Sequence, residues 1–214
     1  FGVSEWSERL PIVLAAMGLI AAGFVIARVV WGTQAGLWAA IVMATLPRFL
    51  MHSRRTSIDV FLSLFMGLTL MFFVLSEARP EKRKLWLCLM YVCVGLGFMT
   101  KGPVAVVLPG AVFFLYLLIE RRLRDTGTMM IPTGIAILLA IVVPWYLLVY
   151  QKHGGGYLAS FILNENISRY TEEGWGPQRN FFYLQTLIGD LFPWSLILIA
   201  GLVCVAFRRR LGDF

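Results

Sequence analysis

Residues 129–150 read MMIPTGIAILLAIVVPWYLLVY and contain no charged side chain. A helix that crosses a bilayer needs about 20 consecutive apolar residues, so this stretch is long enough for one span. Six further apolar runs lie at 10–30, 34–50, 57–76, 85–100, 103–119 and 187–207. The runs are continuous rather than alternating, which predicts helices instead of barrel strands. We therefore expect an all-α, polytopic membrane protein with about seven transmembrane helices.

The composition of the whole chain supports this class. Of the 214 residues, 59% are hydrophobic and 14% are charged, whereas soluble domains average about 25% charged residues. These proportions exclude a typical soluble enzyme, a disordered chain and a disulfide scaffold. The cysteines at 88, 93 and 204 lie in apolar runs without zinc or redox spacing, so we interpret them as buried apolar fillers.

Basic residues predict the orientation of the helices and explain the net charge of +7 without nucleic acid. The segments ARPEKRK at 78–84, ERRLRD at 120–125 and RRR at 208–210, together with Arg28, hold 11 of the 19 Lys and Arg. The positive-inside rule places them in the cytoplasm. Phe1 then starts on the outer side, and the polar stretch 151–186 forms an outer-face loop. Within it, 157–170 is predicted to form a short amphipathic helix at the interface.

Three charged residues at the predicted outer face are candidates for function, because charges at the mouth of a membrane bundle are costly. Asp59 begins the third apolar run, and Lys101 lies in the short turn Thr100-Lys101-Gly102-Pro103. Arg169 follows Glu165 by four residues near the end of the predicted interfacial helix. Two cations and a carboxylate at one membrane surface suit a phosphorylated lipid or another anionic substrate.

Each of these residues also has a structural interpretation. Lys101 could be a snorkelling anchor between two helices. Arg169 could form a simple surface ion pair one helical turn from its partner. Asp59 could cap the helix that follows it, or pair with Arg54 or Arg55. The sequence alone leaves these alternatives open.

Motifs of other enzyme classes are missing from the sequence. It has no Walker loop, no glycine-rich dinucleotide turn and no Ser/His/Asp order, which argues against a soluble nucleotide-sugar domain. His52 and His153 are too isolated in sequence to predict a metal site.

Six patches in chain order carry a resemblance to a known family. They are SEWSERLP at 4–11, the segment from Arg54 to Asp59, FMTKGP at 98–103, PWY at 144–146, ENISRY at 165–170 and the segment 183–194. Together they resemble GT-C membrane glycosyltransferases, namely the ArnT-like aminoarabinose transferases and the protein O-mannosyltransferases. The resemblance extends from one end of the chain to the other.

This resemblance implies an enzyme that moves a sugar from a polyprenyl-phosphate donor to a lipid or protein acceptor. The site would lie at the outer face of a bacterial inner membrane. A carboxylate deprotonates the acceptor hydroxyl, which attacks the anomeric carbon with inversion, and basic residues stabilise the departing lipid phosphate. Lys101 and Arg169 match the phosphate-binding positions, and Asp59 matches a supporting acid. The further candidates for supporting residues are Arg54, Arg55, Glu165 and Tyr170.

Two positions depart from the family pattern. The catalytic carboxylate of the family lies in the first outer loop, ahead of the position that matches Phe1, so the resemblance assigns no general base in this chain. Residues 1–214 would be the transmembrane core without the first span, that loop and the C-terminal part, and we expect them to be inactive alone. Asn166 stands where many members have a His linked to metal. A divalent metal is therefore left open with one ligand of the family missing, and no other cofactor is implied.

Two other classes of function remain open at this stage. A transporter or flippase-like bundle would bind an anionic lipid in the same cationic site without chemistry, and a structural membrane subunit would do neither. A transporter could show an inverted repeat of broken helices, and we see no such repeat in the sequence. An acidic pair in the first outer loop would favour the enzyme.

The predicted orientation can be tested by cysteine labelling from outside intact cells. In the full-length protein without native cysteines, Gly155→Cys should react with an impermeant reagent and Lys82→Cys should not. The reason is that the positive-inside rule places 78–84 in the cytoplasm. Reaction at position 82 would reverse the orientation.

Overall fold

The computed structural model describes residues 5–55, 57–163 and 181–211, and these residues form helices joined by short connections. The helices are α1 Glu5–Trp31, α2 Thr33–Thr45, α3 Pro47–Ser53, α4 Ile58–Ala78, α5 Arg83–Lys101, α6 Val104–Ile119, α7 Ile131–Leu163, α9 Phe182–Asp190 and α10 Trp194–Leu211. Two 3₁₀ segments, Pro80–Lys82 and Leu123–Met129, lie in the connections. No strand occurs among the described residues, so the all-α prediction is confirmed.

The helices differ in whether they are long enough to cross a membrane. Four pass by length and composition, and they cover Trp6–Trp31, Ile58–Ala78, Pro80–Lys101 and Asp125–Gly156. The pair α2 and α3 would count as a fifth span, although it is bent by 66°. The apolar helices Val104–Ile119 and Trp194–Val205 are shorter. The membrane class is therefore confirmed, whereas the predicted number of seven spans is not.

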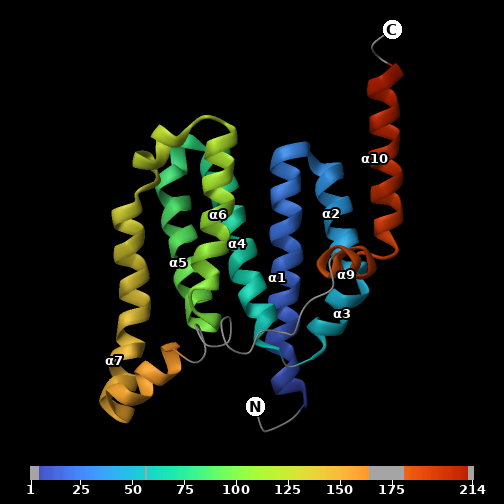
Figure 1. The fold of residues 1–214 in the computed structure, drawn as a ribbon. Helices are drawn as coiled ribbons and strands as arrows, with labels where there is room; N and C mark the ends of the chain where they lie inside the picture. Colours follow the sequence, from blue (N-terminus) through green and yellow to red (C-terminus); the bar gives the residue numbers. More distant parts are fainter. Residues whose placement is uncertain (1–4, 56, 164–180, 212–214) are drawn as a thin grey trace.

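Successive long helices run in opposite directions, so the connections gather at two ends of the bundle (Figure 1). The turn between α1 and α2, both 3₁₀ segments and the end of α10 lie at one end. The connection from α3 to α4, the turn from α5 to α6 and the bend in α7 lie at the other. This arrangement matches the alternation expected from the sequence, and the sidedness itself stays a prediction.

Two apolar clusters hold the helices together. One contains the buried residues Phe73, Leu87, Met90, Phe113, Leu117 and Met129, and it joins α4, α5, α6 and the second 3₁₀ segment. The other contains Ile12, Ala15, Ala16 and Val60, with Phe49, Phe61 and Leu64 packed against it, and it joins α1, α3 and α4. Small residues let α1 approach α4 closely, since a Cβ at Gly18 would lie 2.9 Å from Leu64 Cδ1.

Three breaks shape the bundle. Pro47 is at the start of α3, where the chain bends from α2. Gly102 has φ 72° and ends α5, which confirms the tight turn predicted before Pro103. Gly154 has φ 78° and is the non-helical residue inside α7. Glycine adopts such positive φ values without steric strain.

The structure corrects two predictions near the C-terminus and leaves one incomplete. The apolar run 187–207 is not one helix, because α9 ends at Asp190 and α10 begins at Trp194. Cys204 is exposed, so the interpretation of all three cysteines as buried was wrong, although Cys93 is buried. Helix α7 continues beyond its bend to Leu163, and the rest of the predicted interfacial helix, 164–170, lies outside the described residues.

Gly97 offers a test of the packing beside the α5–α6 turn. A Cβ there would lie 3.0 Å from Ala105 Cβ and 3.3 Å from Phe65 Cβ, so Gly97→Val overpacks the contact between α4, α5 and α6. We expect it to lower the unfolding free energy of the full-length protein by about 1–3 kcal/mol. Gly110→Val is the control, because a Cβ at Gly110 meets no atom within 4 Å. Equal effects in thermal unfolding would contradict this packing.

Candidate functional site

Lys101 is held by the way in which α5 ends. It is the last residue of α5, and the backbone N–H of Gly102 donates to Phe98 O at 2.7 Å. Pro103 follows as the N-cap of α6, which begins at Val104. Because the connection is only two residues long, the Lys101 side chain can reach only the neighbourhood of this end of the bundle.

Asp59 reaches the same place from α4. Ser57 caps α4, since its Oγ accepts a hydrogen bond from the Asp59 backbone N–H at 3.3 Å. The Asp59 carboxylate lies in the first turn, where the helix dipole favours negative charge. Lys101 Nζ donates to Asp59 Oδ1 at 2.5 Å, although 42 residues separate the two in sequence.

This ion pair corrects the structural interpretation of Asp59. Ser57, not Asp59, is the capping residue of α4, and the partner of Asp59 is Lys101 rather than Arg54 or Arg55. The role of Lys101 in phosphate binding stays a prediction. Both side chains stay half exposed, at 43% for Lys101 and 52% for Asp59, so other molecules can reach the pair.

The remaining candidates fall into two groups. Arg54 and Arg55 are exposed residues of the connection between α3 and α4, and they line a pocket of about 420 Å³ together with Pro47, Leu50 and Met51. Glu165, Arg169 and Tyr170, which the sequence also proposed, lie outside the described residues. Within the described parts of the chain, no group of three or more His, Cys, Asp or Glu side chains could hold a metal ion.

The sequence interpretation missed a contact that joins α9 and α10 to the bend between α2 and α3. Arg48 Nε lies 2.7 Å from Asp190 Oδ1. Trp194 Nε1 donates to Thr45 Oγ1 at 2.9 Å across 149 residues of sequence. In the sequence, Thr45 and Arg48 lie on either side of Pro47. Nothing in this local pattern indicates which distant residues they contact.

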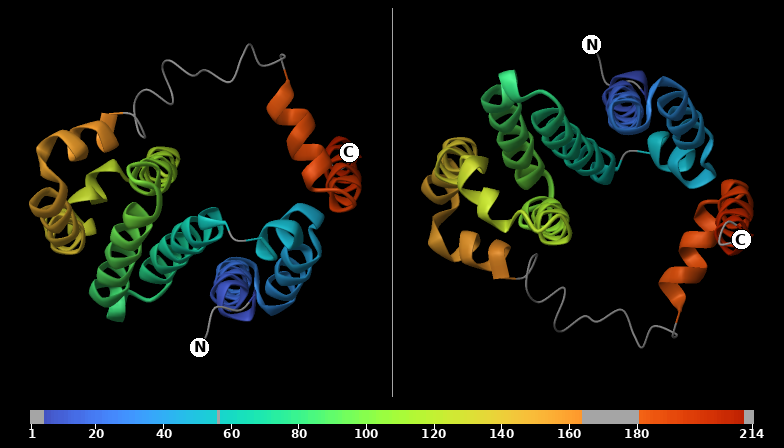
Figure 2. Two further views of the ribbon diagram at one scale, coloured as in Figure 1. Left: turned by 90° about the horizontal axis from the view of Figure 1, so that it is seen from below. Right: turned by 90° about the horizontal axis from the view of Figure 1, so that it is seen from above.

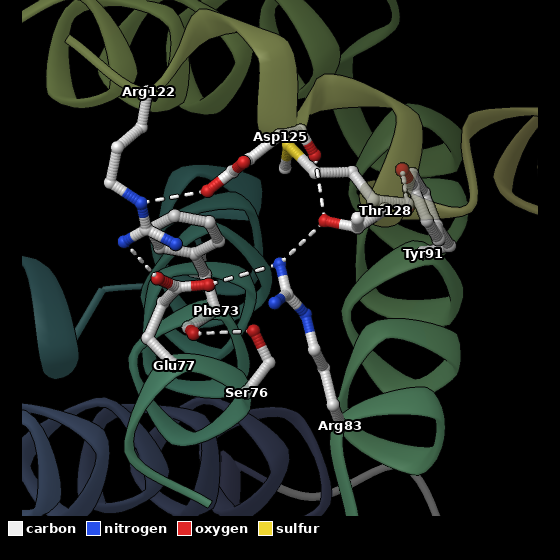
Figure 3. A network of polar contacts seen from close by, with 9 residues as sticks. Phe73, Ser76, Glu77, Arg83, Tyr91, Arg122, Asp125 and Thr128 are labelled. Atoms are coloured by element: carbon white, nitrogen blue, oxygen red, sulfur yellow. Dashed lines mark hydrogen bonds and ion pairs between the residues drawn. The ribbon is translucent and has the colours of Figure 1, made fainter. Parts of the chain in front are cut away.

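A second polar network lies at the opposite end of the bundle (Figure 3). Glu77, at the end of α4, forms an ion pair with Arg83 at 3.1 Å and accepts a hydrogen bond from Arg122 at 2.7 Å. Arg122 also binds Asp125 at 2.8 Å, and Arg83 donates to Thr128 at 3.0 Å. The carboxylates of Glu77 and Asp125 raise the pKa of Arg122 above its ordinary value. The sequence analysis interpreted these loops only as positive charge and did not predict the network.

Comparison with known proteins identifies the class of membrane protein to which this helical fold belongs. The model of the family described as dolichyl-phosphate-mannose-protein mannosyltransferase matches residues 1–148. The crystal structure of ArnT from Cupriavidus metallidurans in the apo state superposes with a TM-score of 0.78 at 25% identity, covering 92% of this chain and 36% of that one. The chain therefore belongs to this mannosyltransferase family and is an ArnT-like GT-C membrane glycosyltransferase in its fold, as the resemblance implied.

Curated relatives agree with this assignment. The undecaprenyl phosphate-alpha-4-amino-4-deoxy-L-arabinose arabinosyl transferase 1 of Pseudomonas fluorescens is 27% identical over 217 residues, which is 98% of this chain and 39% of that protein. The corresponding transferase of Pseudomonas aeruginosa is 28% identical over 216 residues, again 98% and 39%. The chain thus spans about two fifths of the length of these relatives.

The two charged ends should contribute differently to stability. Asp59→Asn breaks a half-exposed pair, which is worth up to about 1 kcal/mol. Glu77→Gln weakens two charged contacts of a carboxylate that is only 19% exposed, so we expect it to cost about 2 kcal/mol or more. Thermal or denaturant unfolding of the full-length protein measures both. A loss for Asp59→Asn as large as for Glu77→Gln would show that the Lys101 pair is mainly structural.

Proposed function

We propose that this chain supplies part of the membrane core of a glycosyltransferase that takes a sugar from a polyprenyl-phosphate donor. The observation that carries the proposal is the accessible Asp59–Lys101 pair at the end of the bundle, in a chain whose relatives are named as undecaprenyl phosphate-dependent transferases. A carrier phosphate lies at the membrane boundary because its prenyl tail stays in the hydrocarbon. An ammonium group fixed at an end of the helices suits that depth.

Lys101 has a defined task in the proposed reaction. The acceptor hydroxyl gives its proton to a carboxylate, the base that the family resemblance implies. Its oxygen forms a bond to the anomeric carbon, and the bond from that carbon to the phosphate oxygen breaks. The electron pair of the broken bond stays on the leaving phosphate. A cation placed beside that oxygen stabilises the developing charge and so lowers the barrier. Asp59 acts as a positioning residue that holds the Lys101 ammonium group at the turn.

Three residues of the patch ENISRY at 165–170 complete the proposed site. Arg169 is the second cation for the phosphate, with Glu165 and Tyr170 as supporting residues, and these three assignments come from the sequence patch ENISRY alone. We place this stretch and the site on the outer face of a plasma membrane, from the distribution of basic residues. None of the described residues is assigned as the general base.

The phosphate assignment predicts the effect of removing either cation. In the full-length enzyme, Lys101→Ala or Arg169→Ala should lower sugar transfer at least about tenfold, because a charge-assisted contact to phosphate is lost. Arg169→Lys should restore only part of the rate, since the planar guanidinium fork is missing. Transfer from a radiolabelled polyprenyl-phosphate sugar measures the rate.

Lys152→Ala is the matched control, because Lys152 is an exposed cation in α7 close to the bend at the same end of the bundle. It should leave transfer within about twofold of wild type, as expected for a surface position without an assigned contact. Folded Lys101→Ala and Arg169→Ala variants that transfer at the wild-type rate would refute the phosphate assignment. Specific binding of the donor without any transfer by the full-length protein would instead favour the transporter-like alternative.

A further inference from the structure

Helix α3 has two faces with different surroundings. Phe49 packs against the apolar cluster of α1 and α4, and Ser53, one turn later, is buried with its Oγ donating to Leu50 O at 3.0 Å. Pro47, Leu50, Met51 and Arg54 follow the spacing i, i+3, i+4 and i+7, which places them together on the opposite face. Leu50 and Met51 are 38% and 40% exposed.

This exposed face forms the pocket of about 420 Å³, whose lining is Pro47, Leu50, Met51, Arg54 and Arg55. The hollow is open to its surroundings rather than enclosed. Three of the lining residues are apolar and two are arginines, the exposed surface of the lining is almost entirely apolar, and the lining contains no carboxylate. The apolar residues come first along α3, and the two arginines follow where the chain turns toward α4 (Figures 1 and 2).

The charge of the two arginines is not balanced by the residues that the structure describes. Lys101 pairs with Asp59, and Arg48 pairs with Asp190. By contrast, no side-chain hydrogen bond or ion pair joins Arg54 or Arg55 to any described residue. Arg54 and Arg55 are exposed and consecutive in sequence, and the planar donors of a guanidinium group match the oxygen pairs of a phosphate.

Apolar residues followed by two cations along α3 and its C-terminal end suit a ligand that is apolar at one end and anionic at the other. A bilayer phospholipid has its phosphate at the boundary and its acyl chains in the hydrocarbon, and basic pockets on membrane helices bind such head groups. We propose that Arg54 and Arg55 bind the phosphodiester of an anionic membrane phospholipid, whose acyl chain lies along Leu50 and Met51. The pocket shares no residue with the Asp59–Lys101 pair, and the proposed ligand is neither the sugar carrier nor the acceptor.

The positions of Arg54 and Arg55 favour a bilayer phospholipid over the sugar carrier as the ligand. A leaving phosphate needs a cation at the reacting bond, and the proposed function assigns that role to Lys101. The pocket lies on the face of α3 opposite Phe49 and Ser53, and so away from the cluster that holds α3 on α1 and α4. A bilayer lipid is always available at such a surface. Lipid bound there would fix the connection that leads from α3 to Asp59.

The test uses the full-length protein in detergent with phosphatidylglycerol or phosphatidylcholine added as the probe. Native mass spectrometry counts retained lipid, and thermal unfolding reports its stabilising effect. We expect wild type to retain phosphatidylglycerol in preference to phosphatidylcholine. Arg54→Gln and Arg55→Gln should each weaken phosphatidylglycerol binding about tenfold, which corresponds to one lost charge-assisted contact. Lys152→Gln, which removes one cation at the same end, should not.

Two further variants distinguish a specific lipid site from non-specific attraction between anionic lipid and positive charge. The double variant R54K/R55K keeps the charge and should bind more weakly than wild type, because the guanidinium forks are lost. Leu50→Gln keeps both arginines but removes apolar contact with the acyl chain, so it should also weaken binding. Unchanged phosphatidylglycerol binding in the folded Arg54→Gln and Arg55→Gln variants would overturn the proposal.

Competition identifies the source of the phosphate. If polyprenyl phosphate or a phosphorylated glycolipid displaces phosphatidylglycerol from wild type, the pocket belongs to a substrate and the proposal is wrong. If neither displaces it, the proposal stands, whatever the outcome of the Lys101→Ala transfer assay. Because lipid retention is measured without turnover, failure of this inference is distinguishable from failure of the proposed function.

Discussion

The exclusion of unpaired charge from hydrocarbon is the constraint on which the rest of this structure depends. A helix satisfies its own backbone groups in lipid, but a charged side chain there costs about 2.5 kcal/mol or more. The described helices therefore carry their acidic and basic residues at or near their ends, as with Asp59, Glu77 and Lys101. Since several helices end at the same level, residues distant in sequence must meet there. The ion pairs between α4, α5 and the loop after α6 follow from this sorting.

The two ends use the same residue types for different purposes. Glu77 is shared between Arg83 and Arg122 and is mostly buried, so it ties the end of α4 to the start of α5 and to the connection after α6, and it leaves little room for another anion. Asp59 and Lys101 form one pair that is half exposed. The first arrangement favours a fixed structure, and the second favours access. Fold stability and the proposed chemistry are thus assigned to opposite ends of α4.

The sequence predicted what depends on local composition. The apolar runs gave the helical membrane class, and Lys101-Gly102-Pro103 gave a tight turn, since glycine and proline restrict the backbone locally. It did not predict which charges meet, because Lys101 pairs across 42 residues and Trp194 across 149. Hydropathy also cannot separate one long helix from two shorter ones. For this reason the bend at Pro47 and the division of 187–207 appeared only in the structure.

The accessible pair has a physical consequence for the proposed reaction. A half-exposed ion pair contributes only about 0.2–1 kcal/mol, because water screens both charges. Lys101 can therefore exchange part of its contact with Asp59 for contact with a phosphate at little cost to the fold. A phosphate that carries more charge than a carboxylate gains more from the same ammonium group when water is excluded. Asp59 keeps the Lys101 side chain ordered before a phosphate binds. A lysine without a partner would instead lose side-chain entropy at each binding step.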